Sequence, residues 1–406
     1  MSTKTWLVRL IPLSPFFFGS ERNFSAGSDP GKANYISRSN YFPQQTSLLG
    51  MLRYELLLQY GLLPISNKNS GTVSKIIGDA SFDPSSSYKQ NFGYIKRLSP
   101  VFIQNVRFAD GVWNTQKRFF RAALEAFEHG ENQKTYMALK SDKARVSFNR
   151  NSWHSFSSPL APYSGKHNIE PSLVEWGGNN HIPFDYDKDN QPNGLFVSDW
   201  RIGITKKDRE EAFYKQRFYR FASAGGNDST CCYCFAFYVE LEDSVSLRSD
   251  RVVSIGGDRS SFKLITQQIM PEKPSPFYNS EEFYGALYYN GYRGTDKIVL
   301  LSDSVVDAQA YQYVHFAVTQ GLEFRNTRAT VADTRKFGPL LSSEKYKSQR
   351  NNNTTSDVPF RGEGYYLLSA GSVFYTETPS EISKLLNAQS NFQTIGYNQY
   401  RLIPKI

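Results

Sequence analysis

The sequence is poor in cysteine and histidine, which restricts the chemistry that it supports. The 406 residues include three cysteines, all in the run CCYC from Cys231 to Cys234, and five scattered histidines. So few clustered cysteines cannot form a disulfide framework, and a zinc site would need a second cluster at ligand spacing, which the sequence lacks. The run CCYCFAFYVELE instead predicts a buried strand, because free cysteine behaves as a small apolar residue. We expect no metal and no cofactor.

Nucleotide-binding motifs and membrane-spanning stretches are missing as well. The sequence has no P-loop and no GxGxxG pattern, so mononucleotide and dinucleotide sites are unsupported. The apolar runs near the start are interrupted by Arg9, Pro12 and Pro15, and no apolar stretch reaches the length of a membrane span. We therefore expect no export signal, no membrane association and a cytoplasmic location.

The chain is rich in basic and aromatic residues. Its net charge is +9, its pI is about 9.2 and aromatic residues make up 15% of the sequence. This charge favours a polyanionic partner. Aromatic rings can stack on unpaired bases, although more of them fill cores and protein interfaces.

The segment from Ser39 to Leu58 predicts a helix with two different faces. Leucines recur at helical spacing and predict a core stripe: Leu48, Leu49, Leu52 and Leu56. A second face carries Thr46, Gly50 and Arg53, which can lie against a phosphate backbone near a helix start. The other interpretation is a helix packed closely through Gly50, with Arg53 in solvent.

Three glycine-containing turns are candidate phosphate contacts. They contain Gly19 and Ser20, then Gly256 and Gly257, and finally Ala370, Gly371 and Ser372. Glycine lets the backbone approach a ligand closely, and successive N–H groups in such turns can hold a phosphate. Taken singly, each turn is also compatible with an ordinary β-turn. Arginine and amide side chains near these segments complete the candidate RNA contacts: Arg22, Asn40, Gln44, Gln45, Arg201 and Arg259.

Seven segments in order resemble one family. They are LVRLIPLSPFFFGSERNF from Leu7, SNYFPQQTSLLGMLRYELLL from Ser39, FGYIKRLSPVFI from Phe92, LFVSDWRIGI from Leu195, SIGGDRSSFKL from Ser254, GYYLLSAGSVFYTE from Gly364 and TIGYNQYRLIP from Thr394. Together they resemble the RAMP superfamily of CRISPR RNA-binding proteins, and within it the guide-capping subunits of type III-B (Cmr) effector complexes.

The resemblance implies an α+β fold of two ferredoxin-like (RRM-like) domains. Residues 1–295 would form the first domain, with a long irregular insertion at about 141–194, and residues 296–406 the second. The order strand, helix, two strands, helix, strand after residue 296 agrees with this. Locally, the pattern also predicts a second helix from Lys117 to His129 and a hairpin around Ala370 and Gly371.

In this family the glycine turns border a groove that holds the 5′ end of the guide RNA. The resemblance implies a non-catalytic subunit that binds the 5′ tag of the CRISPR guide RNA and bridges the large polymerase-cyclase subunit to the backbone RAMP subunits. A related branch cleaves RNA with a histidine near its start, whereas here no histidine precedes His129. A guide-processing endoribonuclease and the equivalent type III-A subunit remain as alternatives.

The polar segment from Ser141 to Gln191 carries spaced aromatic residues, namely Trp153, Phe156, Tyr163, Trp176, Phe184 and Tyr186. Disordered linkers are usually poor in aromatic residues, and such rings often anchor protein interfaces. We expect this insertion to dock on a neighbouring subunit, and among these on the large one. The alternative is a loop that folds back over its own domain.

Overall fold

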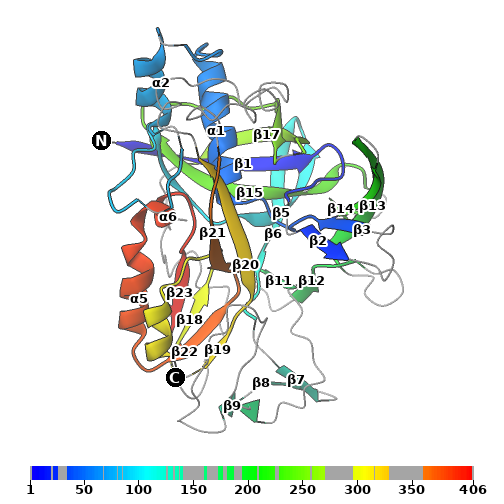
Figure 1. The fold of residues 1–406 in the computed structure, drawn as a ribbon, viewed down its shortest axis with the longest axis vertical. Coiled ribbons are helices and arrows are strands. Elements are labelled where there is room, and N and C mark those ends of the chain that lie inside the picture. The colour runs from blue at the N-terminus through cyan, green and yellow to red at the C-terminus, as the bar shows by residue number, and fades with distance from the viewer. Residues whose placement is uncertain are drawn as a thin grey trace.

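The computed structural model describes most of the chain. The described residues are 2–19, 22–25, 34–66, 68–79, 81–84, 86–124, 127–130, 133–136, 138–139, 160–161, 172–176, 181–186, 194–207, 210–224, 228–256, 258–269, 296–314, 316–328 and 360–404. The fold is mixed α+β and dominated by sheets, with few helices. Figure 1 shows a larger sheet under α1 and α2 in one half of the molecule, and a smaller sheet beside α5 in the other half.

The larger sheet has nine strands, and β1 (Thr3–Pro12) lies near its centre. Its order is β12-β11-β6-β5-β15-β1-β17-β16, and β4 also pairs with β15. β1 runs antiparallel to both β15 and β17. The other bounds are β4 (Ile95–Leu98), β5 (Phe102–Ala109), β6 (Val112–Arg121), β11 (Ser172–Glu175), β12 (His181–Pro183), β15 (Cys231–Glu242), β16 (Arg251–Ile255) and β17 (Ser260–Ile269). The cysteine run thus starts a strand, as predicted.

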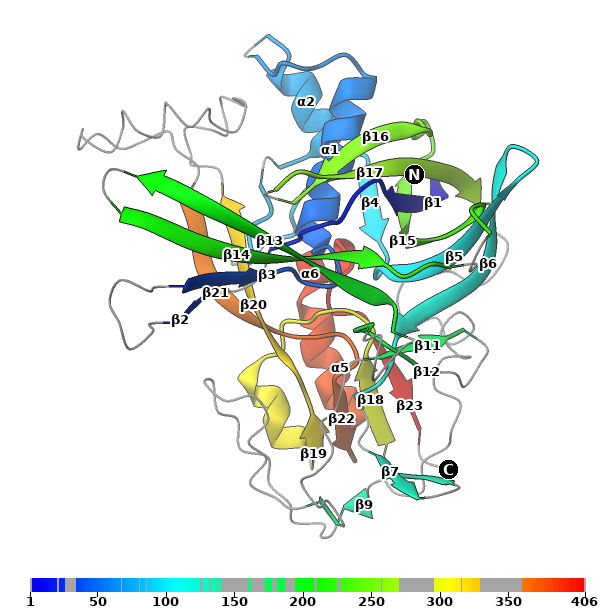
Figure 2. The same ribbon diagram turned by 90° about the vertical axis from the view of Figure 1, so that its right-hand side faces the viewer.

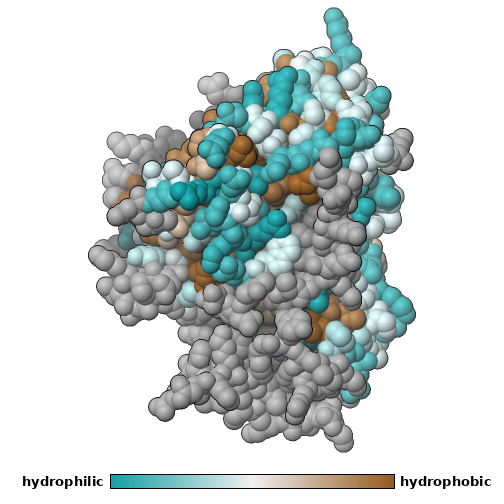
Figure 3. All heavy atoms as spheres, turned by 180° about the vertical axis from the view of Figure 1, so that it is seen from behind, coloured by the Kyte–Doolittle hydropathy of each residue, from teal (hydrophilic) through white to brown (hydrophobic). Residues whose placement is uncertain are grey.

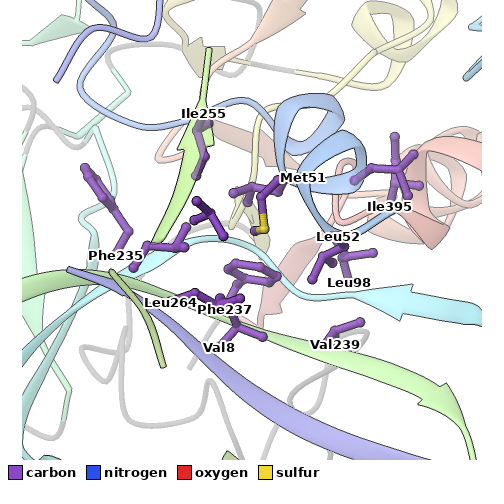
Figure 4. Close-up of a cluster of buried hydrophobic side chains, with 14 of the residues drawn as sticks. Val8, Met51, Leu52, Leu98, Phe235, Phe237, Val239, Ile255, Leu264 and Ile395 are labelled. Atoms are coloured by element: carbon purple, nitrogen blue, oxygen red, sulfur yellow. The ribbon is translucent and has the colours of Figure 1, made fainter. Parts of the chain in front are cut away.

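Helix α1 (Gln45–Gln59) covers one face of this sheet, which confirms the helix expected from the leucine spacing. Leu48, Leu52 and Leu56 are completely buried, and each contributes about 2 kcal/mol from burial. Figure 4 shows Met51 and Leu52 of α1 facing Val8 of β1 and Phe237 of β15. The shorter helix α2 (Ser70–Ile77) packs beside α1.

A second sheet forms an arm that projects from the body (Figure 2). Its order is β13-β14-β3-β2, with bounds β13 (Phe196–Lys207), β14 (Glu210–Phe221), β3 (Asn34–Arg38) and β2 (Arg22–Ser25). Phe16 holds the base of the arm, because its N–H donates to the carbonyl of Tyr219 at 2.7 Å and its carbonyl accepts from the Tyr219 N–H at 3.0 Å.

The smaller sheet has four strands in the order β19-β22-β18-β23. Its elements are β18 (Asp296–Leu300), the 3-10 helix η3 (Ala308–Tyr313), β19 (Phe316–Val318), β22 (Val373–Thr376), α5 (Pro379–Ala388), α6 (Ser390–Thr394) and β23 (Tyr400–Ile403). The strands thus lie side by side as the second, third, first and fourth of this unit. The central strands β5-β15-β1-β17 of the larger sheet repeat that order when they are counted along the chain, and all these neighbours are antiparallel.

Further strand pairs complete the described part of the chain. β20 (Gly321–Arg328) pairs with β21 (Phe360–Leu368), β7 (Phe127–Gly130) with β8 (Gln133–Tyr136), and β9 (Ala138–Leu139) with β10 (Leu160–Ala161). The hairpin expected around Gly371 is therefore wrong: β21 pairs with β20, whereas β22 pairs with β18 and β19. The predicted domain boundary between residues 295 and 296 stays a prediction.

We call the larger sheet with α1 and α2 the first unit, and the smaller sheet with α5 and α6 the second unit. The two units share one core and are joined by a row of hydrogen bonds, which we call the polar seam. Ile395 and Tyr397, which follow α6, belong to the same buried cluster as Val8 and Leu52. The seam consists of hydrogen bonds between segments far apart in sequence: Gln45 Nε2 to Gly396 O (3.4 Å), Gln90 N to Asn391 Oδ1 (2.8 Å), Leu124 N to Gly371 O (2.7 Å) and Arg121 Nη1 to Asp303 Oδ1 (2.7 Å).

The second helix expected from Lys117 to His129 is wrong, because this stretch contains the end of strand β6. Phe119 and Phe120 are both buried, Phe119 next to Tyr233 and Phe120 stacked on Phe102. Consecutive residues can both be buried when a strand is covered on both faces. β6 lies between β5 and β11, so tertiary pairing overrides the apparent helical spacing.

The insertion is not irregular throughout. Within about 141–194, β11 extends the larger sheet by pairing with β6, and β12 pairs with β11. Leu173, Val174 and Phe184 are buried in the protein's own core, and Trp176 packs against Phe120. The described parts of this segment thus pack on their own domain, which corrects our expectation for the buried Phe184. Trp176 is half-buried, and its docking on a neighbouring subunit stays a prediction. Trp153, Phe156 and Tyr163 lie outside the described residues.

Candidate nucleic-acid interface

Two of the predicted glycine turns lie next to each other, although more than 230 residues separate them in the sequence. Gly256 has φ +81°, and a Cβ there would lie 2.9 Å from the carbonyl oxygen of Phe17. The Phe17 N–H donates to Ser260 Oγ at 2.9 Å. Only glycine allows this approach without strain. The pairing of β1 with β17 therefore brings the two turns together.

Asn40 joins the same place. Its N–H donates to the carbonyl of Gly19 at 3.3 Å, and the Phe18 N–H donates to Ser39 Oγ at 2.9 Å. Gly19 has φ +74°, and no atom lies within 4 Å of the position of a Cβ. The Gly19 turn is thus supported on one side and open on the other.

Arg259 and Arg201 place two cations beside these turns. Arg259 is exposed, has φ +52° and donates its N–H to the Gly256 carbonyl at 3.1 Å. The Arg201 guanidinium carbon lies 4.0 Å from the ring centroid of Phe218, and that ring lies 5.1 Å from Phe17. We call Gly19, Asn40, Arg201, Gly256 and Arg259 the glycine-turn surface.

The opposite face of the arm carries residues that the sequence analysis missed. Trp200 and Ile202 are 48% and 69% exposed, and they pair in register with Arg217 and Lys215. Arg217 Nη2 donates to Asp185 Oδ1 at 3.4 Å, whereas Arg217 Nε has no hydrogen-bond partner among the described residues. Successive residues of a strand point to opposite faces, so the sequence VSDWRIGI indicates that Trp200 and Ile202 lie on the face opposite to Arg201.

Tyrosines anchor this face to the body. Tyr41 stacks on Tyr219 with ring centroids 4.6 Å apart. Burial, together with Tyr219 and the carboxylate of Asp185, raises the pKa of the Tyr41 phenol. The phenol stays neutral and fixes the base of the arm.

Elsewhere, Figure 3 shows that the described surface on the reverse side is mostly hydrophilic with small hydrophobic patches.

Arg53 does not share an open surface with Gly50. It is 7% exposed, and burial lowers the pKa of its guanidinium to about 10, although the charge of Asp79 opposes this shift. Its Nε and Nη2 make no hydrogen bond within the described part of the chain, and the guanidinium carbon lies 5.8 Å from the Phe92 ring centroid. Gly50 is exposed, with open space around it.

The remaining candidates on α1 lie at the seam. Gln45 is buried, and its Nε2 donates to the carbonyls of Ser99 and Gly396 at 3.1 and 3.4 Å. Thr46 is half-buried and lies beside Tyr397. The carbonyl of Gln44, the N-cap, accepts from the Leu48 N–H at 3.1 Å.

The turn of Ala370, Gly371 and Ser372 is buried between the two units. The Gly371 N–H donates to the Leu300 carbonyl, and the Gly371 carbonyl accepts from Leu124, both at 2.7 Å. A Cβ at Gly371 would lie 2.4 Å from the Ala122 carbonyl oxygen. Close backbone approach occurs here as expected, but the partner in the structure is protein.

Three predicted residues have no described side-chain position. Ser20 and Gly257 lie outside the described residues, and Arg22 is described only as the first residue of β2. The structure therefore brings Gly19, Asn40, Arg201, Gly256 and Arg259 together, and it separates them from Gln45, Arg53 and Gly371.

Comparison with known proteins identifies this sheet-dominated α+β chain as a subunit of Cmr-type CRISPR complexes. The chain belongs to the family of the CRISPR-associated protein Cas_Cmr3, whose model matches residues 8–404. No match is found among curated proteins.

Several solved structures resemble the chain, among them two from type III CRISPR complexes. One chain of a cryo-EM structure of the type III-B Cmr-beta complex bound to cognate target RNA is 12% identical, with 99% of both chains covered and a TM-score of 0.42. A chain of the Csm3-Csm4 subcomplex of the type III-A CRISPR-Cas interference complex is 11% identical, with 91% of this chain and 92% of that chain covered and a TM-score of 0.32.

No helix in the described part of the chain is both long and apolar enough to cross a membrane.

Proposed function

We propose that this protein is a non-catalytic RNA-binding subunit of a type III-B CRISPR ribonucleoprotein that acts in the cytoplasm. In this role it grips the 5′ tag of the guide RNA and bridges the large polymerase-cyclase subunit to the backbone RAMP subunits in antiviral defence. Membership of the Cas_Cmr3 family supports the complex, and the net charge of +9 supports a polyanionic partner.

The glycine-turn surface is the observation that carries the RNA proposal. Two backbone turns with positive φ meet there, the Gly19 side is open, and Arg201 and Arg259 flank it. Backbone N–H groups in such turns and arginine forks are the groups that hold phosphates and base edges. Asn40 adds an amide that can both donate to and accept from a base.

We infer that the two units are ferredoxin-like, which is typical of RRM-like RNA-binding proteins. The shared strand order in β5-β15-β1-β17 and β19-β22-β18-β23 supports this inference, as does α5 between β22 and β23. In the first unit, β16 takes the position along the chain where a second helix would stand.

Guide binding by the assembled complex tests the function. With a single-stranded RNA that carries the 5′ tag, Arg259→Ala and Arg201→Ala should each weaken binding by about 1–3 kcal/mol and reduce the salt dependence by about one counterion. Arg248→Ala is the matched control, because Arg248 is exposed and bonds to the Gln59 carbonyl at the end of α1. Unchanged affinity and salt dependence in both test variants would refute the proposed surface.

A further inference from the structure

In the described part of the chain, β13 is an edge strand whose outer side is unpaired along most of its length. At its start, the Phe196 N–H donates to the Phe184 carbonyl at 2.7 Å, and its carbonyl accepts from the Tyr186 N–H at 2.8 Å. These bonds define the side of β13 that faces away from β14. Because backbone groups alternate along a strand, the N–H and C=O groups of Ser198, Trp200 and Ile202 point to the same outer side. Among the described residues no strand pairs with them.

This edge lacks three of the features that protect edge strands, namely short length, proline and a bulge, although its sequence contains charged residues. β13 has 12 residues, contains no proline, and pairs with β14 from Phe196–Phe221 to Lys207–Glu210 without a register shift. Short length, prolines and bulges are among the usual means of preventing the addition of another strand. A long and regular edge on a projecting arm suits β-strand addition.

The side chains on this edge suit a protein. Trp200 and Ile202 are two residues apart, so they share one face, and they are 48% and 69% exposed. A strand added to β13 would lie about 4.8 Å away and would place its own side chains against both. Tryptophan is enriched among interface anchors, and Ile202 enlarges the apolar surface beside Trp200.

The charges indicate what kind of segment fits. The described side chains of the hairpin include four cations, Arg201, Lys215, Arg217 and Arg220, and one carboxylate, Asp199. Lys215 and Arg217 lie on the same face as Ile202 and Trp200, one strand further in, and Arg217 also pairs with Asp185 at 3.4 Å. They are within about 10 Å of an added strand, which is about one Debye length. A second copy of this chain would bring like charges together, so an acidic partner is favoured.

We propose that β13 receives an extended, acidic segment of a neighbouring protein subunit as an additional strand, with apolar side chains of that segment covering Trp200 and Ile202. This inference rests on the proposed role as a subunit of a larger complex. It assigns the outer edge and one face of the arm to protein and leaves the glycine-turn surface, on the other face, to RNA. The arm then joins the two kinds of partner.

Hydrogen exchange resolved to single amides tests the proposal on the full chain in three states: alone, with a synthetic single-stranded RNA, and in the complex co-expressed with its neighbouring subunits. The outward amides of Ser198, Trp200 and Ile202 should exchange rapidly in the first two states and at least about tenfold more slowly in the complex. The inward amides of Val197, Asp199 and Arg201, which pair with β14, serve as internal controls. Unchanged exchange of the outward amides in the complex overturns the proposal.

Two other results would also overturn it. Protection by the RNA alone would make the occupant a nucleic acid, and protection that grows with the concentration of the free chain would make it a second copy. Failure of the RNA function is seen separately, in unaltered guide binding by the Arg259→Ala complex.

A proline substitution gives a second, independent readout. Ile202→Pro removes an outward N–H and leaves the N–H groups that bond to β14 in place, so the hairpin should be retained. The amount of neighbouring subunit that co-purifies should fall about fivefold or more, whereas Ile202→Thr, which keeps the N–H, should lose less. Equal co-purification by the folded proline variant and wild type would contradict the proposal. If the proline variant does not fold, exchange in the wild type decides.

Discussion

Arg121 at the end of β6 and Asp303 after β18 form an ion pair that joins the two units. Arg121 Nη1 donates to Asp303 Oδ1 at 2.7 Å, and the two side chains are 18% and 12% exposed. The same Oδ1 accepts the Ala370 N–H at 3.0 Å, and the Arg121 guanidinium carbon lies 4.3 Å from the Phe42 ring centroid. One carboxylate thus holds a strand end and a buried turn together.

Removal of this carboxylate should destabilise the protein strongly. Asp303→Ala removes an ion-pair partner from the largely buried Arg121 guanidinium and the acceptor of the Ala370 N–H, so the free energy of unfolding should fall by about 2–4 kcal/mol. Urea unfolding followed by tryptophan fluorescence measures it. Lys384→Ala is the control, since its ion pair with Glu381 is exposed and should contribute less than about 1 kcal/mol. Equal losses in both variants would contradict a specific role for Asp303.

Two glycines should respond to alanine in opposite directions. Gly371→Ala places a Cβ 2.4 Å from the Ala122 carbonyl at φ +91°, so we expect destabilisation by about 2 kcal/mol or more. Gly50→Ala adds a methyl group in open space inside α1 and should stabilise the protein by about 0.5–1 kcal/mol. Thermal unfolding of the two variants decides. A stabilised Gly371→Ala protein would show that the turn is not packed as described.

The cysteine thiols of β15 should need a higher pH for alkylation than a solvent-exposed thiol does. Burial raises the pKa of the Cys232 thiol to about 11, and burial also raises that of Cys234. The thiolate is the reactive form. Alkylation of Cys232 by iodoacetamide in the native protein should therefore be very slow at pH 8 and increase about tenfold per pH unit towards pH 11. Peptide mass spectrometry measures it, and the urea-denatured protein is the control. Rapid native alkylation of Cys232 at pH 8 would be inconsistent with its partial burial in β15.

Phe184 tests how the insertion is attached. It is 7% exposed, and its ring lies 4.9 Å from Tyr41 and 5.7 Å from Phe196. Phe184→Ala should cost about 3–4 kcal/mol of stability because it leaves a cavity at the base of the arm. Tyr88→Ala, at a side chain that is 64% exposed, should change stability by less than about 0.5 kcal/mol. A loss below about 1 kcal/mol for Phe184→Ala would mean that this segment is held elsewhere.

The sequence predicts elements well where the local pattern and the tertiary environment agree. α1 has leucines at helical spacing and is found where that spacing predicts a helix, and the cysteine run forms the start of β15. The end of β6 shows the opposite case. Phe120, Leu124 and Phe127 mimic a helical stripe, but pairing with β5 and β11 decides the conformation. Such pairing partners cannot be read from a local window.

For the candidate site, residue types were predicted better than their surroundings. Each glycine turn is visible in the sequence, but the meeting of Gly19 with Gly256 depends on β1 pairing with β17. Arg53 is buried beside Phe92, whereas an arginine on a helix is normally exposed, so its residue type gives no sign of this burial. Arg217 and Trp200 become neighbours only through the register of the hairpin.

The position of β1 in the larger sheet has a consequence for synthesis of the chain. Among the described residues, β1 has no paired strand until β15 and β17 exist, and Leu10 pairs with Phe235 and Leu264. At a synthesis rate of about 5–20 residues per second, the apolar first strand waits for roughly 10–50 seconds before either partner leaves the ribosome. During this interval Leu7, Val8 and Leu10 are available to chaperones or to other nascent chains. Fragments that stop before residue 231 should therefore aggregate, and the order of translation becomes part of how this subunit reaches its complex.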